Sequence, residues 1–314
     1  MKAIAIKEFG GIDQLHLIEV PTPKPTSQEV LIEVVYTAVN PVDWKIREGM
    51  LKERLPHHFP LILGWDVSGI IAAVGNDVTH FKPGDAVFAY CRKPVVQWGT
   101  YAEYVTFEAE NVAHKPKNIT FAQAAAIPLV GLTAWQALFD VAKLKKGETI
   151  LVHAGAGGVG SFAIQFAKHI GAHVYTTASK ANHDYVKQLG AEHAIDYKQG
   201  FVDAIKKLAP QGIDVVFDCV GGETLEESSK VIKKGGRLVS IVSKPDPALE
   251  DQGIHTGYVF VRPSGKELTE IGHLIEQGKV VIPTIQEMPL KEAAAAQEKS
   301  RTGHTQGKIV LKVR

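Results

Sequence analysis

The sequence predicts an α/β protein in which a doubly wound parallel sheet is joined to an irregular antiparallel β domain. Its 314 residues are more than one domain with a single hydrophobic core usually has, and they are enough for two domains. β-Branched residues and turn signals dominate the chain up to about residue 115, and helix alternates with strand from residue 120 onward. Repeated strand–helix–strand units need right-handed crossovers, so the second half predicts a parallel sheet.

Three strands are predicted in the first part, separated by glycine and proline. They cover residues 29–36, 67–74 and 101–105, and turn signals occur at 21–25, 75 and 83–85. This punctuation is typical of an irregular antiparallel β domain.

The second part begins with a predicted long helix over residues 122–144. Strands follow at 149–152, 173–177, 193–195, 215–218, 237–241 and 258–261, with helices near 158–170, 180–189, 199–208, 223–233 and 264–277. A last strand at 307–313 has no partner in a finished parallel sheet, so we expect it to join the first domain. The expected domains are therefore 1–119, completed by 264–314, and 120–263.

Composition and charge exclude several classes of protein. The net charge is +1, from 35 basic and 34 acidic residues, which argues against a nucleic-acid-binding surface. Cys91 and Cys219 are too far apart in the sequence for a disulfide framework or zinc spacing. We find no hydrophobic run long enough for a membrane span and no secretory signal pattern. A cytoplasmic protein is expected, and an organellar form that has lost its transit peptide stays open.

A glycine-rich turn between a predicted strand and a predicted helix is the strongest functional signal. It contains Gly155, Gly157, Gly158, Val159 and Gly160. Glycines let a backbone approach a pyrophosphate, and the N–H groups and dipole of the following helix stabilise its charge. We expect a bound dinucleotide. The alternative is a structural turn in a ligand-free α/β protein.

The end of the second strand of this predicted sheet indicates which dinucleotide is bound. Folds that select NAD place a carboxylate there to bind the adenosine 2′-OH. This chain has Ser179 and Lys180 instead, and Asp184 falls inside the predicted helix. A hydroxyl and an ammonium suit a 2′-phosphate, which a carboxylate would repel. We expect NADPH rather than NADH; the alternative is a helix-capping serine beside a solvated lysine.

Several separated motifs give the chain a resemblance to a known family. They are residues 1–4 (MKAI), 40–45 (NPVDWK), 64–69 (GWDVSG), 81–87 (FKPGDAV), 131–134 (GLTA), the glycine turn, 189–191 (LGA) and 307–311 (GKIVL). With them the chain resembles the zinc-independent quinone oxidoreductase (zeta-crystallin-like) branch of the medium-chain dehydrogenase/reductase superfamily. The resemblance implies a GroES-like catalytic domain, an irregular β-barrel built from both chain ends, with a Rossmann domain between them and the cofactor in a cleft. It also implies that Thr133 lies beside the nicotinamide ring and that Tyr197 contacts the 2′-phosphate.

The residues at the positions of zinc ligands differ from those of the related zinc enzymes. Zinc alcohol dehydrogenases have a cysteine ligand where Asn40 stands, and Gly-His-Glu where this chain has Gly64, Trp65 and Asp66. A carboxamide and an indole cannot replace a thiolate and an imidazole as zinc ligands. We therefore expect no zinc.

Without a metal to stabilise an alkoxide, alcohol oxidation is disfavoured and hydride transfer to an electron-poor acceptor is favoured. The hypothesis is an NADPH-dependent reductase whose small-molecule acceptor is a quinone or an α,β-unsaturated carbonyl. Asn40 would orient the nicotinamide or the substrate oxygen, Asp43 would organise its loop, and Lys45 would donate a hydrogen bond. Asp43 and Lys45 could instead form a surface ion pair.

Two other functions remain open at this point. One is a catalytically weak NADPH-binding sensor or scaffold, because fold does not fix function. The other is polyketide-type enoyl reduction, which differs only in the acceptor. The resemblance also implies a homodimer formed by edge-to-edge pairing of the Rossmann sheets, and residues 239–242 and 258–261 are the candidate edge strands.

Overall fold

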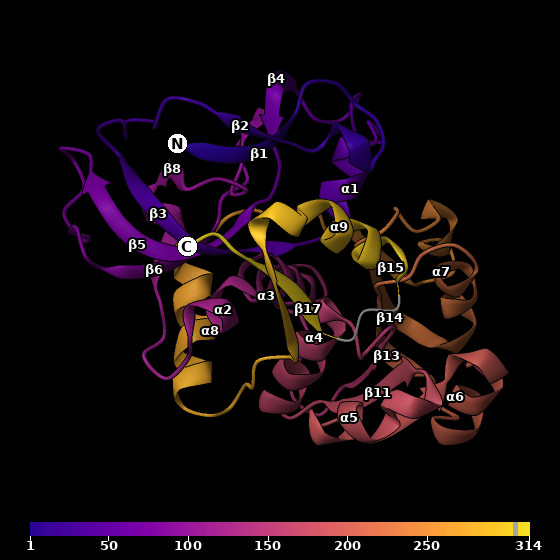
Figure 1. The fold of residues 1–314 in the computed structure, drawn as a ribbon. Helices are drawn as coiled ribbons and strands as arrows, with labels where there is room; N and C mark the ends of the chain where they lie inside the picture. The colour runs from indigo at the N-terminus through magenta and orange to yellow at the C-terminus, as the bar shows by residue number, and fades with distance from the viewer. Residues whose placement is uncertain (304–306) are drawn as a thin grey trace. The chain divides into compact units, whose positions relative to one another are not determined.

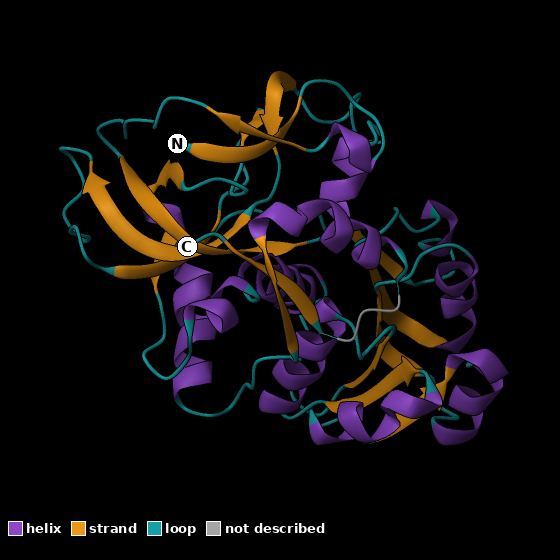
Figure 2. Ribbon diagram, in the orientation of Figure 1, coloured by secondary structure: helices purple, strands orange, loops and turns teal. Residues whose placement is uncertain are grey.

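The computed structural model describes residues 1–303 and 307–314, which form two compact units (Figure 1). The first unit comprises Met1–Leu129, Arg262–Gly278 and Ile282–Arg314, and the second comprises Val130–Val261 and Lys279–Val281. Both units contain strands and helices (Figure 2). Within the described ranges, no helix is long and apolar enough to cross a bilayer.

The strands of the first unit form two sheets. One has the order β2-β1-β4-β7, from His16–Glu19, Lys2–Ile6, His57–Ile62 and Val96–Trp98. The other has the order β16-β17-β3-β5-β6-β9, from Ile285–Pro289, Lys308–Lys312, Glu29–Val39, Asp66–Val74, Ala86–Tyr90 and Val112–His114, and β8 (Tyr104–Glu108) also pairs with β3. Inward-facing residues of the second sheet, including Val30, Ile32, Val67, Val87 and Phe107, form its hydrophobic core.

The C-terminal strand β17 completes this second sheet. It runs antiparallel to β3, with Ile309 opposite Val39 and Lys312 opposite Tyr36. In Figure 1 its yellow ribbon belongs to the same sheet as the indigo β3. The last strand of the chain therefore pairs within the first unit, along β3.

The strand predicted at 101–105 begins later than expected. Tyr101 and Ala102 pair with β1 instead, since the Tyr101 carbonyl accepts the Ile4 N–H at 2.8 Å and Ala102 bridges Ala3. The chain joins β3 only from Tyr104 onward. Pairing of Tyr101 and Ala102 with β1 thus determines where β8 begins.

The helix predicted over 122–144 is broken into three parts. They are α2 (Phe121–Ala125), α3 (Pro128–Trp135) and a π-helical turn (Gln136–Val141). Pro128 lacks an N–H and suits only the first turn of a helix, so it begins α3. Ala122, Ala125 and Ala126 pack against Ala38 and Val310, which explains why the first unit extends to Leu129 and not only to residue 119.

The remaining helices of the first unit are α1 (Pro41–Arg47), α8 (Gly265–Glu276) and α9 (Ala293–Arg301). Helices α1 and α9 pack together, and Arg47 of α1 donates to the Gln297 side chain of α9 at 3.0 Å. This contact ties the segment after Asn40 to the C-terminal part of the chain.

The second unit is a parallel sheet with interleaved helices, as the sequence predicts. Its strand order is β12-β11-β10-β13-β14-β15, from His193–Asp196, His173–Ala178, Thr149–Val152, Ile213–Asp218, Ile232–Ser240 and His255–Tyr258. The helices are α4 (Gly158–His169), α5 (His183–Gln188), α6 (Val202–Leu208) and α7 (Glu223–Ser228). Leu151, Val216, Leu238 and Ile205 are in the core between these elements.

One of the two expected edge strands is an inner strand. Strand β14 pairs with β13 on one side and with β15 on the other, so residues 239–242 offer no free edge along Val239 and Ser240. The edge of the sheet is β15, which ends at Tyr258. The segment predicted as a strand at 258–261 thus contributes only its first residue.

Candidate cofactor-binding site and buried polar cluster

The glycine turn has no room for a side chain at two of its glycines. A Cβ on Gly160 would lie 2.3 Å from the Ala154 carbonyl oxygen, and one on Gly155 would lie 2.0 Å from Thr176 Oγ1. Ala154 itself has a φ of 56°, in the left-handed region that L-residues rarely adopt. The turn is therefore a tightly fitted connection between β10 and α4 rather than a loose loop.

The N-terminus of α4 follows directly after this turn. Gly157 is its N-cap, and no side chain caps the helix among the residues described. The N–H groups of Gly158, Val159 and Gly160 belong to the first turn, where intrahelical acceptors are lacking. These groups and the helix dipole give this end a positive potential that suits a phosphate.

Two neighbouring strands end at the same edge of the sheet as β10. Val152 of β10 pairs with Thr176 of β11, and Ala178 of β11 pairs with Asp196 of β12. Because all three strands are parallel, their carboxyl ends meet there. The glycine turn, Ser179 with Lys180, and Tyr197 follow these three ends in that order.

The side chains at the ends of β11 and β12 are accessible. Lys180 is exposed, Tyr197 is 50% exposed, and Ser179 is partly buried and accepts from Asn182 Nδ2 at 3.2 Å. Asp184 lies inside α5, as predicted.

Thr133 lies on α3 and is buried. Two residues later, the Trp135 ring packs edge-on against Phe166 of α4, with 5.4 Å between ring centroids. The helix that carries Thr133 is therefore packed against the helix that begins at the glycine turn.

Asn40 belongs to a buried polar group in the first unit, which we call the Asn40 cluster: Asn40, Asp43, Asp66, Tyr101 and Lys308. Asn40 Nδ2 donates to Asp66 Oδ2 at 2.8 Å, and its Oδ1 accepts from Lys308 Nζ. Lys308 Nζ lies 3.7 Å from Asp66 Oδ2. All five side chains are buried.

The Asp66 carboxylate also binds the start of α3. Its Oδ1 accepts the Leu129 N–H at 2.7 Å, in the first turn of that helix. Burial raises the pKa of Asp66, and the nearby Lys308 ammonium opposes that shift. Burial likewise lowers the pKa of Lys308, opposed by the Asp66 charge. Each of the two charges thus offsets most strongly the cost of removing the other from water.

Asp43 is an interior carboxyl group. Its Oδ2 accepts the Asn40 N–H at 2.8 Å and the Tyr101 hydroxyl at 3.0 Å, whereas Oδ1 has no hydrogen-bond partner among the described residues. Burial raises its pKa to about 7. Because Asp43 is buried, it does not form a surface ion pair with Lys45, whose ammonium lies 5.5 Å from the Trp44 ring centroid.

The chemistry around Asn40 does not suit a zinc ion. An amide, an ammonium and an indole face the positions where zinc enzymes have a thiolate and an imidazole, and Trp65 is packed edge-on against Tyr90 at 5.9 Å. In the described parts of the chain, no three His, Cys, Asp or Glu side chains are grouped so as to hold a metal.

Comparisons with known proteins agree with this arrangement. The chain matches the family model of the alcohol dehydrogenase GroES-like domain over residues 26–117 and that of the zinc-binding dehydrogenase over residues 189–311. It is 35% identical to the chloroplast envelope quinone oxidoreductase homolog of Arabidopsis thaliana, over 99% of this chain and 98% of that protein. The chain belongs to the medium-chain dehydrogenase/reductase superfamily. Within it, the protein is a member of the zinc-independent quinone oxidoreductase-like branch.

Two further members of the superfamily are similar over nearly the whole chain. The NADPH-dependent alkenal/one oxidoreductase of Arabidopsis thaliana is 38% identical, over 99% of this chain and 79% of that protein. The solved structure of the quinone oxidoreductase from Coxiella burnetii superposes with a TM-score of 0.90 at 37% identity, covering 100% of this chain and 99% of that one.

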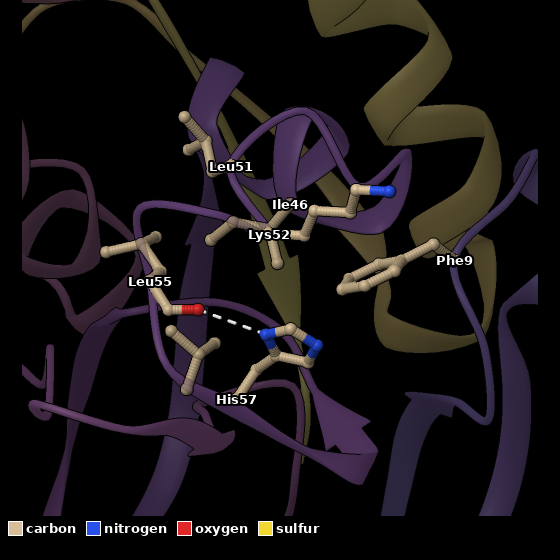
Figure 3. A pocket seen from close by; sticks show the side chains of 7 residues that line it. Phe9, Ile46, Leu51, Lys52, Leu55 and His57 are labelled. Carbon is tan, nitrogen blue, oxygen red and sulfur yellow. Dashed lines mark hydrogen bonds between the residues drawn. The ribbon is translucent and has the colours of Figure 1, made fainter.

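A cavity in the first unit of this dehydrogenase/reductase is too small for a substrate. Figure 3 shows its lining, in which the Phe9 and His57 rings lie edge to face at 4.8 Å and His57 Nδ1 bonds the Leu55 carbonyl at 3.0 Å. Its volume is about 10 Å³, room for about one water-sized sphere. Small-molecule sites usually enclose roughly 300–1,000 Å³. The acceptor is therefore not assigned to this cavity.

Sequence reasoning missed the roles of Asp66 and Lys308. No spacing rule connects residues 40, 66 and 308, because the contacts depend on β17 pairing with β3. One signal was available: Lys308 lies two residues before Val310, so both point to the same face of the strand. A lysine on an inward face indicates a buried acidic partner.

Proposed function

We propose that this protein is an NADPH-dependent reductase that transfers hydride to a quinone or an α,β-unsaturated carbonyl. The observation that carries the proposal is the convergence of the glycine turn, Ser179 with Lys180, and Tyr197 at the carboxyl ends of three adjacent parallel strands. Relatives named for quinone and alkenal/one reduction support the same reaction class.

We assign the cofactor contacts to this strand edge. The backbone of Gly155, Gly157, Gly158, Val159 and Gly160 would hold the pyrophosphate at the start of α4, and the close fit at Gly155 and Gly160 keeps this backbone in place. Ser179, Lys180 and Tyr197 would hold the 2′-phosphate through a hydroxyl, an ammonium and a phenol. Thr133 would lie beside the nicotinamide. The bound cofactor supplies the hydride.

The reaction is proposed to proceed without zinc. The Lys308 ammonium already occupies the polar pocket between Asn40 and Asp66, and a second cation there would be repelled. A quinone or an activated enone accepts hydride without a Lewis acid, and the resulting oxyanion needs only hydrogen-bond donors and a proton.

The three expected catalytic residues receive different proposed roles. Asn40 and Asp43 have their side chains engaged within the Asn40 cluster, so we propose them as positioning residues for the segment that starts α1. Lys45 lies two residues further along this helix and has a partly exposed side chain. It is proposed as the hydrogen-bond donor to the acceptor oxygen.

Stopped-flow mixing of the purified protein with NADPH or NADH and a panel of quinones, 2-alkenals, cyclic enones and an enoyl thioester tests the proposal. We expect NADPH oxidation with at least one class and a clear preference over NADH. Tight NADPH binding without oxidation by any acceptor would instead favour the sensor or scaffold. Preference for an enoyl thioester would indicate the enoyl-reductase alternative.

The compartment and the assembly are further proposals. We propose a cytoplasmic protein, although relatives are named as chloroplastic or mitochondrial, and cell fractionation tests this assignment. We also propose a homodimer that pairs through β15, the strand at the edge of the parallel sheet. Sedimentation of the purified protein over a range of concentrations tests the dimer.

A further inference from the structure

His153 is a buried residue directly before the strained residue of the glycine turn. Its ring is fully buried, with Nδ1 3.1 Å from Thr177 Oγ1 and Nε2 3.1 Å from Ser228 Oγ. Phe201 packs edge-on against the ring at 4.6 Å. The side chain thus connects the ends of β10 and β11 with the end of α7.

The hydrogen bonds around His153 determine which ring nitrogen carries the proton. Ser228 Oγ donates its only proton to the Thr224 carbonyl at 2.6 Å, so it accepts from Nε2–H. Thr177 Oγ1 accepts the Ala154 N–H at 3.1 Å, which leaves its own proton for Nδ1. The imidazole is therefore neutral, with Nδ1 as the acceptor. Burial lowers its pKa to about 4, which agrees with this assignment.

The Thr177 hydroxyl holds Ala154 in its left-handed conformation. With a φ of 56°, Ala154 persists only because surrounding contacts fix it. Its N–H is bound by Thr177 Oγ1, and its carbonyl accepts the Gly157 N–H at 3.0 Å. The same carbonyl lies against Gly160, the third residue of α4. His153, through Thr177 and Ala154, is thus connected to the whole turn.

We propose that His153 is a positioning residue for the cofactor: by accepting from the Thr177 hydroxyl it holds Ala154 in place and keeps the glycine turn preformed for a pyrophosphate. This inference rests on the proposed NADPH-binding function. It assigns to the chain a residue that touches no cofactor atom but sets the geometry of the backbone that does. Preorganisation of this kind raises affinity because less conformational freedom is lost on binding.

Two substitutions separate the two ring nitrogens. His153→Asn keeps an acceptor near the Nδ1 position, whereas His153→Gln keeps a donor near the Nε2 position and loses that acceptor. The measurement is the Kd for NADPH by fluorescence titration, with the thermal midpoint recorded for each variant. We expect H153Q to raise the Kd about tenfold, or about 1.4 kcal/mol, and H153N to stay within about threefold of the wild type.

A second-site change tests the connection through Ala154. Glycine adopts a positive φ without strain, so adding Ala154→Gly to H153Q should recover most of the lost NADPH affinity. A purely structural role for His153 would move the thermal midpoint of both His153 variants without this recovery. Should H153Q fail to fold, Thr177→Val, which removes the hydroxyl itself, takes its place with the same expected loss.

The outcomes are distinguishable from failure of the proposed function. If the wild type binds no NADPH, the proposed function is wrong. If the wild type binds NADPH and H153Q or T177V binds it equally well, the inference about His153 is overturned. Equal losses in H153N and H153Q, with no recovery by A154G, overturn it as well.

Discussion

Gly160→Ala and Gly157→Ala should have opposite effects on folding and on cofactor binding, although both glycines belong to one turn. A Cβ at 160 would meet the Ala154 oxygen at 2.3 Å and the Gly155 Cα at 2.8 Å. These are backbone atoms, which cannot rotate away. A Cβ at 157 meets only the Ala154 oxygen at 3.2 Å, and the φ of −77° there suits any residue.

The magnitudes follow from these contacts. Overpacking a close-fitted site costs about 1–3 kcal/mol, and the upper value applies because the clash is with backbone. Alanine recovers about 1 kcal/mol over glycine inside a helix. Gly160→Ala should therefore lose about 2 kcal/mol of unfolding free energy, a fall of roughly 5–8 °C in Tm. Gly157→Ala should leave Tm within about 2 °C, since its contact is relieved by a small shift.

For cofactor affinity, the substitution at residue 157 should have the clear effect, although it leaves the fold intact. The second glycine of such a turn lets the backbone approach the pyrophosphate, so a methyl group at 157 should raise the NADPH Kd at least tenfold in a fully folded protein. Calorimetry gives the Tm of both variants, and fluorescence titration gives the Kd of Gly157→Ala. A wild-type Tm for Gly160→Ala would refute the steric argument, and a wild-type Kd for Gly157→Ala would refute the placement of the pyrophosphate.

Three further outcomes are expected. Lys180→Ala should weaken NADPH binding about tenfold and leave NADH binding unchanged, because only NADPH carries the 2′-phosphate; equal losses for both in paired titrations would contradict its role. Lys308→Met leaves Asp66 charged and buried, so chemical denaturation should show a loss of about 3–5 kcal/mol, part of which Asp66→Asn restores in the double variant. Burial raises the pKa of Asp43 to about 7 in the folded chain, above its unfolded value of 3.8, so its protonated form contributes stability that is full below pH 3.8 and is lost as pH rises through 7. Between pH 5 and pH 8 the wild type should therefore lose roughly 2–4 kcal/mol relative to Asp43→Asn, and parallel stability profiles would contradict this.

Local patterns were sufficient to predict the parallel sheet and its glycine turn. Strand β10 is a continuous apolar run before the turn, and α4 begins where the glycines end. The start of β8 could not be predicted in this way, because Tyr101 pairs with β1 through a contact between distant segments. The break before Pro128 could have been predicted, since proline suits only the first turn of a helix, but the alanine-rich residues before it favoured one continuous helix.

The site also has one part that follows from local sequence and one part that depends on contacts between distant segments. Ser179 and Lys180 could be predicted because they follow one strand directly, whereas the Asn40 cluster depends on three strands meeting. Only the pairing of β17 with β3 brings Lys308 to Asn40. A contact between two residues so far apart in the sequence cannot be read from the pattern of a single sequence.

The place of β17 also has a consequence for the order of folding during synthesis. The ribosome completes Val130–Val261, nearly all of the second unit, before it makes Lys308–Lys312. Until then β3 lacks its β17 partner along Tyr36–Val39, and the Asn40 amide and the Asp66 carboxylate lack their cation. The second unit should therefore fold before the first unit, although its residues are made later. Until β17 is made, the sheet of the first unit has an unpaired edge at β3. Such an intermediate is a binding site for chaperones and a risk for aggregation, so nascent chains stalled before residue 308 should be protected from proteolysis in the second unit only.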